Sequence, residues 1–190
     1  MIIVVTGLPG VGKTRFLRRL VKGELFYLIE IDKIKYRMLE QKRFLLSTSC
    51  RQHYNPPRYW KKEDIIGNHE KMMAHYKDMG RCLNEYLIPA LAYIKKSGNW
   101  IVEISPFLLE YIEMEGDVFW FYTSRTSHET NIATRIRSDV IDAGKIMALY
   151  NYHFNFIESQ VNRLISKRVD IKNKKNAEHF IDTIQHKISL

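Results

Sequence analysis

The chain of 190 residues is poor in cysteine and contains no long apolar run. No apolar stretch approaches the roughly 20 residues of a membrane helix, so we expect no membrane-spanning helix. The two cysteines, Cys50 and Cys82, have neither the spacing of a metal site nor a disulfide framework. We therefore expect both to be packing residues in a reducing, intracellular compartment. Because the chain begins directly with a strand pattern, we also expect no signal peptide and a cytoplasmic protein.

Acidic residues are also scarce, with 21 against 30 lysines and arginines, for a net charge of +9. This balance predicts an anionic partner, either a nucleotide or RNA or DNA, although the basic side chains could instead simply solvate the surface. Hydrophobic residues make up 45% of the chain, enough for a buried core. No repeat, low-complexity tract or linker interrupts it. We predict a single domain over residues 1–190.

The N-terminal segment carries the most specific motif. Residues 2–5 form a β-branched apolar run typical of a buried strand, and residues 7–14, GLPGVGKT, match the pattern G-x-x-x-x-G-K-[ST] completely. An amphipathic helical pattern follows. A strand, a glycine loop and a helix in this order are the context that a phosphate-binding loop requires. The predicted nucleotide-binding residues are Gly7, Gly10, Val11, Gly12, Lys13 and Thr14.

This motif predicts how the phosphates of ATP and a Mg²⁺ ion are held. The glycines let successive backbone N–H groups point inward at phosphate oxygens, and the helix N-terminus adds partial positive charge. Lys13 should reach the β- and γ-phosphates, while the Thr14 hydroxyl should bind Mg²⁺. The alternative is a glycine-rich turn with a chance lysine.

A second apolar run, residues 25–31, predicts another buried strand, which ends in Asp32. Since ligands bind outside the carboxyl ends of strands in open α/β sheets, we expect Glu30 and Asp32 near the phosphates. A carboxylate there can accept the proton of an attacking hydroxyl. Asp32 could equally be the N-cap of the helical pattern at residues 33–43, which carries Arg37.

A third strand is predicted over residues 100–104, with Glu103 near its carboxyl end. A carboxylate in a buried strand is costly unless it is paired or close to a cation. At this position it is well placed to hold Mg²⁺, directly or through water. A structural ion pair is the alternative.

The region between the second and third strands is less regular. Residues 44–67 contain two adjacent prolines and an aromatic and basic cluster at residues 54–62, which could stack a base or pack as an ordinary surface loop. Residues 68–96 show a long helical pattern, interrupted at Pro89. Arg81 falls outside the apolar positions of that helix. It could have a functional role, or it could simply be a solvated arginine. We expect an acceptor-binding insertion over residues 44–80.

The C-terminal half adds a fourth strand at residues 118–122 and a weak fifth at residues 168–171, before a last helix. Between them, residues 124–145 form a predicted lid containing Arg125, Arg135 and Arg137. Arginines just past the fourth strand can close over a triphosphate and neutralise developing charge, although each could also be a surface residue. The elements together predict an α/β fold with a five-stranded, mostly parallel sheet and helices on both faces.

The order of these elements resembles the P-loop nucleoside and nucleotide kinases, especially thymidylate kinase and the deoxynucleoside kinases. Beyond the glycine loop, the resemblance rests on Arg81 with Glu85, residues 87–91 (LIPAL) and Gly98; on residues 102–105 (VEIS); on residues 116–118 and 135–137; and on residues 168–171 with the last helix. It implies a three-layer P-loop kinase fold with a small lid, and ATP and Mg²⁺ as cofactors.

The chain departs from that family at two positions. Ile104 stands where the family has an arginine after the third-strand acid. The family's glutamate-proline motif after the second strand is replaced by Glu30-Ile31-Asp32. This acid-x-acid ending is similar to shikimate and gluconate kinases and to the kinase domain of polynucleotide 5′-kinases, in which such an aspartate engages the acceptor hydroxyl.

The leading hypothesis is therefore a kinase that transfers the γ-phosphoryl group of ATP to a small nucleoside-like or anionic acceptor. Catalysis is assigned to Lys13, Asp32 and Arg135, with Arg125 or Arg137 assisting at the phosphates. Asp32, Arg37, Arg81 and Glu103 are assigned to acceptor binding, and Thr14 and Glu103 also to the metal. The alternatives are a kinase of RNA or DNA 5′-hydroxyls and a regulatory ATPase without an acceptor. We also leave open a homodimer.

Overall fold

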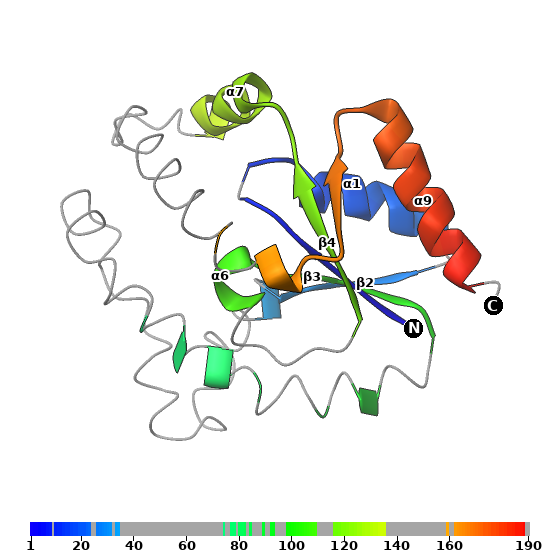
Figure 1. Cartoon of the computed structure of the whole chain (residues 1–190). Coiled ribbons are helices and arrows are strands. Elements are labelled where there is room, and N and C mark those ends of the chain that lie inside the picture. The colour runs from blue at the N-terminus through cyan, green and yellow to red at the C-terminus, as the bar shows by residue number, and fades with distance from the viewer. Residues whose placement is uncertain are drawn as a thin grey trace.

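The computed structural model describes residues 1–8, 10–23, 26–31, 33–34, 74, 77–78, 80–82, 84, 89, 92–93, 98–109, 116–135, 159 and 162–188. Its centre is a five-stranded sheet in the order β2-β3-β1-β4-β5 (Figure 1). The strands are β1 (Ile2–Thr6), β2 (Tyr27–Glu30), β3 (Trp100–Glu103), β4 (Asp117–Tyr122) and β5 (Lys167–Asp170). All neighbouring strands run parallel. The predicted α/β fold with a parallel five-stranded sheet is confirmed.

The central and edge strands differ in burial, as their positions in the sheet require. In β1 and β4 the residues on both faces are buried, which explains their continuous apolar sequences. The prediction that the second strand is also fully buried is wrong. β2 lies at an edge, spans only four residues, and leaves Tyr27 59% exposed. It ends at Glu30, and Ile31 is already helical, so the strand stops before the predicted Asp32.

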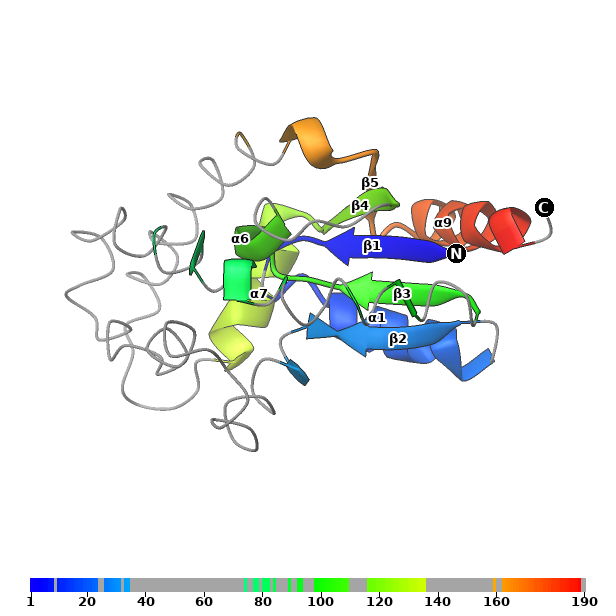
Figure 2. The ribbon, with the colours of Figure 1, turned by 90° about the horizontal axis from the view of Figure 1, so that it is seen from below.

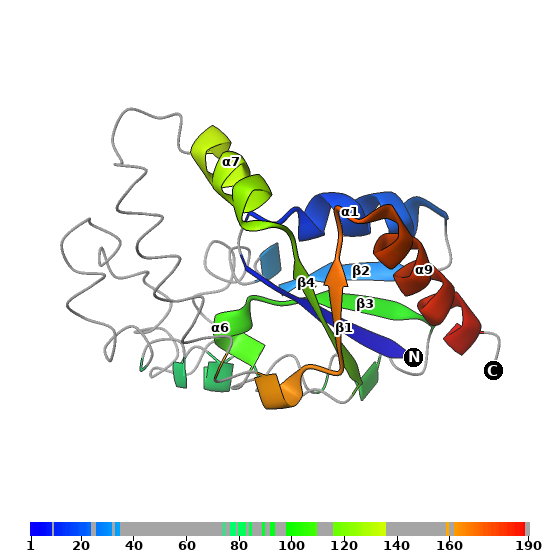
Figure 3. The same cartoon turned by 45° about the horizontal axis from the view of Figure 1, so that its top comes forward.

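Two helices, α1 (Lys13–Leu20) and α9 (Lys174–Ile188), cover one face of the sheet (Figure 3). Aromatic side chains pack both helices against β4. Phe180 of α9 packs edge-on against Phe119 and Phe121 of β4, at ring-centroid distances of 4.9 and 5.0 Å. Phe16 of α1 lies 5.5 Å from Phe121. These contacts fix α1, and with it the glycine loop that leads into it, to the middle of the sheet.

Two further helices lie beyond the carboxyl ends of the strands (Figure 2). They are α6 (Pro106–Leu109), which follows β3, and α7 (Arg125–Arg135), which follows β4. α7 begins one residue after the start of the segment that the sequence predicts as a lid. Short 3-10 helices, Val21–Gly23 and Asn162–Leu164, follow α1 and precede β5. Most of the predicted insertion at 44–80, and the lid beyond residue 135, lie outside the described residues.

Cys82 corrects one expectation from the sequence. Its side chain is 5% exposed and belongs to the main core, as expected for a packing residue, but it is disulfide-bonded. Pairing depends on whether the fold brings two Cα atoms to within about 6 Å, which spacing along the chain does not reveal.

None of the helices in the described ranges is long and apolar enough to cross a bilayer.

Candidate active site

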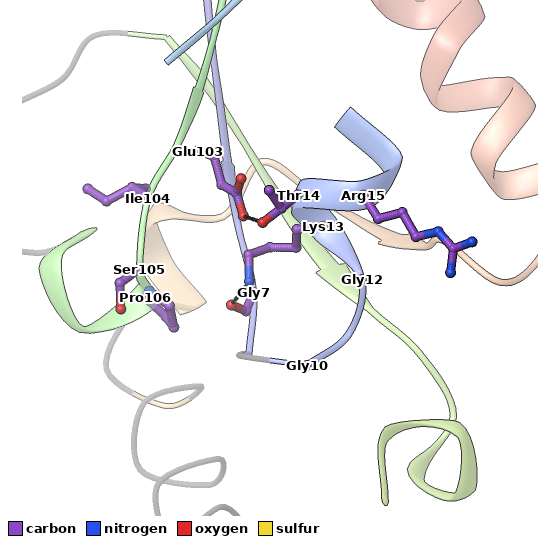
Figure 4. A pocket seen from close by; sticks show the side chains of 10 residues that line it. All are labelled: Gly7, Gly10, Gly12, Lys13, Thr14, Arg15, Glu103, Ile104, Ser105 and Pro106. Atoms are coloured by element: carbon purple, nitrogen blue, oxygen red, sulfur yellow. Dashed lines mark hydrogen bonds between the residues drawn. The ribbon is translucent and has the colours of Figure 1, made fainter. Parts of the chain in front are cut away.

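The glycine loop between β1 and α1 forms one side of a pocket at the carboxyl edge of the sheet (Figure 4). Gly7, Gly10 and Gly12 have φ angles of 140°, 89° and 103°, in the region that side-chain-bearing residues rarely adopt. A Cβ atom on Gly7 would lie 2.1 Å from the carbonyl oxygen of Phe121 in β4. The loop therefore passes against the backbone of the sheet, which only glycine permits.

The start of α1 is suited to an anion. Gly12 is the N-cap, it offers no side-chain hydrogen bond to the first turn, and that turn carries no acidic residue. The first N–H groups of a helix have no partner within the helix, and they carry its positive partial charge. Uncapped N–H groups at the end of a glycine loop are a ready phosphate site.

Lys13 places its ammonium group within the loop. The residue is 9% exposed, and Nζ donates hydrogen bonds to the carbonyl oxygens of Gly7 and Leu8 at 2.8 and 3.0 Å. A buried ammonium group needs such acceptors. The same position lets it exchange carbonyl oxygens for the oxygens of a phosphate without leaving the loop.

Thr14 and Glu103, the two predicted metal residues, are in direct contact. The Thr14 hydroxyl donates to Oε1 of Glu103 at 2.7 Å, although the residues are 89 positions apart in the chain. Figure 4 shows both side chains on the same side of the pocket. One hydroxyl and one carboxylate form the sparse set of hard oxygen donors that Mg²⁺ prefers when phosphate oxygens and waters complete its coordination. The donor set fits Mg²⁺.

One helical turn after Thr14, α1 makes a second contact with a strand end. Arg18 donates to both carboxylate oxygens of Glu30, at 3.0 and 2.8 Å, and Lys33 donates to one of them at 2.9 Å. The hydrogen bond from Arg18 is the main cause that lowers the pKa of Glu30 below its ordinary value. Glu30 is therefore held as a carboxylate by two cations rather than directed at the phosphates, the position that its strand end suggested.

In the described residues, only part of the predicted site lines a common pocket. Gly7, Gly10, Gly12, Lys13, Thr14 and Glu103 line one pocket, together with Arg15, Ile104, Ser105 and Pro106. Val11 belongs to the same loop, and its side chain is buried in the core. Ile104 is 1% exposed, and this position offers the pocket no cation.

The predicted arginines are placed less completely. Arg125 is exposed at the start of α7, and Arg135 ends that helix. Arg81 is helical, its side chain is 68% exposed, and it lies 4.0 Å from Asp78 rather than among the residues described around the pocket. Asp32, Arg37 and Arg137 lie outside the described residues. The roles assigned to all six remain predictions.

Two side chains at this site were not predicted from the sequence to belong to it. Arg18 stands four residues after Thr14, so helical spacing alone placed both on one face of α1 and could have indicated it. Asn131 of α7 donates from its amide nitrogen to the carbonyl oxygen of Gly10 at 2.9 Å. That contact joins residues 121 positions apart, and no local sequence pattern predicts it.

Comparison of the fold with solved structures yields full-length matches. TT1252 from Thermus thermophilus is 12% identical and has a TM-score of 0.67, with 99% of this chain and 97% of that chain covered. Shikimate kinase from Bacteroides thetaiotaomicron is 11% identical, with a TM-score of 0.54 and coverage of 100% and 99%. The chain has the P-loop kinase fold. Shikimate kinase from Acinetobacter baumannii, in complex with shikimate, agrees at 13% identity, TM-score 0.52 and coverage of 98% and 92%.

At identities of 11–13%, the structural similarity shows a common fold and leaves the reaction to be argued from the site. No protein-family model and no curated protein matches the chain by sequence.

Proposed function

We propose that this protein is an ATP-dependent kinase that phosphorylates a small hydroxyl-bearing acceptor, anionic or nucleoside-like. The observation that carries the proposal is the 2.7 Å hydrogen bond between Thr14 and Glu103, beside a glycine loop that holds Lys13. A glycine loop alone supports phosphate binding. A carboxylate brought from a different strand to the hydroxyl of that loop adds a metal site, which phosphoryl transfer requires.

On the donor side, the loop amides and Lys13 bind the β- and γ-phosphates, and Thr14 and Glu103 hold Mg²⁺. An ion held there would supply positive charge that neutralises the charge developing on the transferred group. We assign Arg125, with Arg135 or Arg137, to neutralise negative charge on the phosphates. Together these groups supply the electrostatic stabilisation and positioning that dominate catalysis of phosphoryl transfer.

On the acceptor side, we assign Asp32 to orient the hydroxyl and accept its proton, and Arg37 and Arg81 to bind an anionic acceptor. The register of the sheet supports the first assignment, because Glu30 lies opposite Glu103 and the chain leaves β2 beside the metal residues. With Glu30 held by Arg18 and Lys33, Asp32 is the remaining acid of the acid-x-acid pair for this task.

A screen for acceptor-dependent ADP production tests the proposal. Candidate acceptors are nucleosides, nucleotides, small hydroxy acids including shikimate, other small alcohols and 5′-hydroxyl oligonucleotides. With the best acceptor, Glu103→Gln and Asp32→Asn should each lower kcat by about 10²- to 10³-fold. Asp32→Asn should bind ATP normally. Glu178→Gln, which changes an exposed acid paired with Lys174 in α9, is the matched control and should retain full activity.

Two results would contradict this proposal. Full turnover by Asp32→Asn would remove that residue from the mechanism. ADP release that never depends on any acceptor, with Mg²⁺-dependent ATP binding intact, would instead favour a regulatory ATPase.

A polynucleotide acceptor is the second candidate, supported by the basic surface of α1. Arg15 and Arg19 are exposed on this helix, directly after the phosphate loop, and Lys22 is exposed in the 3-10 helix that follows it. The whole chain carries a charge of +9. Binding of a 5′-hydroxyl oligonucleotide should then weaken steeply with salt, because each neutralised phosphate releases counterions. A shallow salt response would favour the small-molecule acceptor.

A further inference from the structure

The peptide bond between Gly10 and Val11 is held from outside the phosphate loop. The side-chain amide of Asn131, in the second turn of α7, donates to the Gly10 carbonyl oxygen at 2.9 Å, in a partly buried position. Inside the loop, the carbonyl groups of Gly7 and Leu8 already accept hydrogen bonds from Lys13. Gly10 is thus the loop carbonyl that a different secondary-structure element holds.

The geometry of the peptide links that carbonyl to a donor on the opposite side. In a planar trans peptide the C=O and the following N–H point in opposite directions. With the Gly10 oxygen directed at Asn131, the Val11 N–H is directed into the loop, where it makes a long hydrogen bond to the Leu8 oxygen at 3.5 Å. Lys13 Nζ donates to the same oxygen. The Val11 N–H and the Lys13 ammonium therefore converge on one point.

Gly10 makes this arrangement easy to lose. Its φ angle is 89°, and glycine occupies positive and negative φ about equally well. Nothing in the residue itself keeps the Gly10–Val11 peptide in one orientation. An external hydrogen bond to its carbonyl supplies the missing restraint.

We infer that Asn131 is a positioning residue for nucleotide binding: by holding the Gly10 carbonyl, it keeps the Val11 N–H directed at the phosphate position beside Lys13. This inference rests on the proposed function, since it assigns Asn131 to the same phosphate site. It also means that the second turn of α7 is fixed to the loop, so that the helix carrying Arg125 keeps a constant position relative to the phosphate loop.

The chemistry of the side chain provides the test. Asn131→Ala removes the donor. Asn131→Asp keeps the shape but replaces the donor by an anionic acceptor next to a carbonyl and near bound phosphate. Asn131→Gln retains an amide donor on a longer side chain. Asn162→Ala is the matched control. It also removes one side-chain hydrogen bond, to Arg168, but Asn162 precedes the amino end of β5, whereas the pocket lies at the carboxyl ends of the strands.

The experiment measures the Kd for Mg·ADP by calorimetry at a temperature where circular dichroism shows every variant fully folded. Asn131→Ala and Asn131→Asp should each raise Kd by about 5- to 10-fold, the worth of one hydrogen bond. Asn131→Gln should recover part of the loss, and Asn162→Ala should match the wild type.

The two ideas fail in different ways. If the wild-type protein does not bind Mg·ADP, the proposed function is wrong. If the wild type binds, but Asn131→Ala or Asn131→Asp stays within about twofold of Asn162→Ala, the inference about Asn131 is overturned while the proposed function stands. Partial recovery in Asn131→Gln, with none in Asn131→Asp, would not follow from a purely steric role, because Asp matches the shape of Asn more closely than Gln does.

Discussion

At the scale of single residues, α1 contacts two adjacent strands through side chains one helical turn apart. Thr14 donates to Glu103 of β3, and Arg18 donates to Glu30 of β2. Glu30 and Glu103 are register partners, so two carboxylates lie side by side at the carboxyl edge of the sheet. Arg18 and Lys33 neutralise the first of them. The second can then serve a metal without an uncompensated anion beside it.

The Arg18–Glu30 pair predicts a pH-dependent contribution to stability. Because the folded state lowers the pKa of Glu30 below its usual value of 4.5, the pair stabilises the protein fully above that pH. The contribution is lost as pH falls through the lowered pKa. Urea denaturation of the wild type and Glu30→Gln should therefore show a small difference in unfolding free energy that is constant near pH 7 and shrinks below pH 4.5.

Glu178→Gln is the control for this measurement. Glu178 is 57% exposed and 3.7 Å from Lys174, whereas the Glu30 side chain is only 14% exposed. Exposed pairs of this kind contribute little. A difference for Glu30→Gln that stayed constant down to pH 3 would show that the lost packing, not the charge, mattered.

At the scale of elements, the glycine loop is defined by how closely it approaches β4. Gly7 and Gly98 have similar φ angles, 140° and 150°. Their surroundings differ: a Cβ on Gly7 would meet the Phe121 carbonyl at 2.1 Å, whereas one on Gly98 would meet the Tyr27 ring at 3.4 Å. Comparing the two positions separates the effect of close approach from that of backbone conformation.

We expect Gly7→Ala to destabilise the fold by about 3 kcal/mol or more, because backbone must move to relieve the contact. Gly98→Ala should cost about 1 kcal/mol, the penalty for its φ angle alone. Chemical denaturation of both variants measures the difference. Equal losses would mean that conformation, and not contact with β4, requires the glycine at position 7.

At the scale of the whole molecule, the pocket draws together elements from across the sheet. The loop after β1, the end of β3 and the start of α6 line it, and α7 contacts the loop from the β4 side. A ligand bound there touches segments that meet only in the folded state. Binding should therefore stabilise the domain as a unit.

Thermal denaturation with nucleotide measures this linkage. Mg·ADP at 100 times its Kd should add about 2.7 kcal/mol of stability, a rise of roughly 5–10 °C in Tm. Removing Mg²⁺ with EDTA should reduce the shift in the wild type and change little in Thr14→Ala. AMP, which lacks a β-phosphate, should give a much smaller rise. An equal rise with AMP would contradict the assignment of Lys13 and the loop to the β-phosphate.

Local patterns were sufficient for much of this architecture. Apolar runs marked β1, β3 and β4 to within a residue, and the glycine motif located the start of α1. β2 was predicted too long because an edge strand is shorter and half-exposed, and apolar content does not distinguish edge from centre. The disulfide at Cys82 depends on a distance between segments, which composition does not contain.

What the sequence alone determined is the set of local conformations: glycines that adopt left-handed φ, strands that need burial and a helix that presents Thr14 and Arg18 on one face. These follow from backbone sterics and hydrophobic periodicity, which act over a few residues. Only the tertiary structure decided the partners, Glu103 for Thr14, Glu30 for Arg18 and Asn131 for Gly10. Strand order and helix packing set those distances, because they bring together side chains from segments up to 121 positions apart.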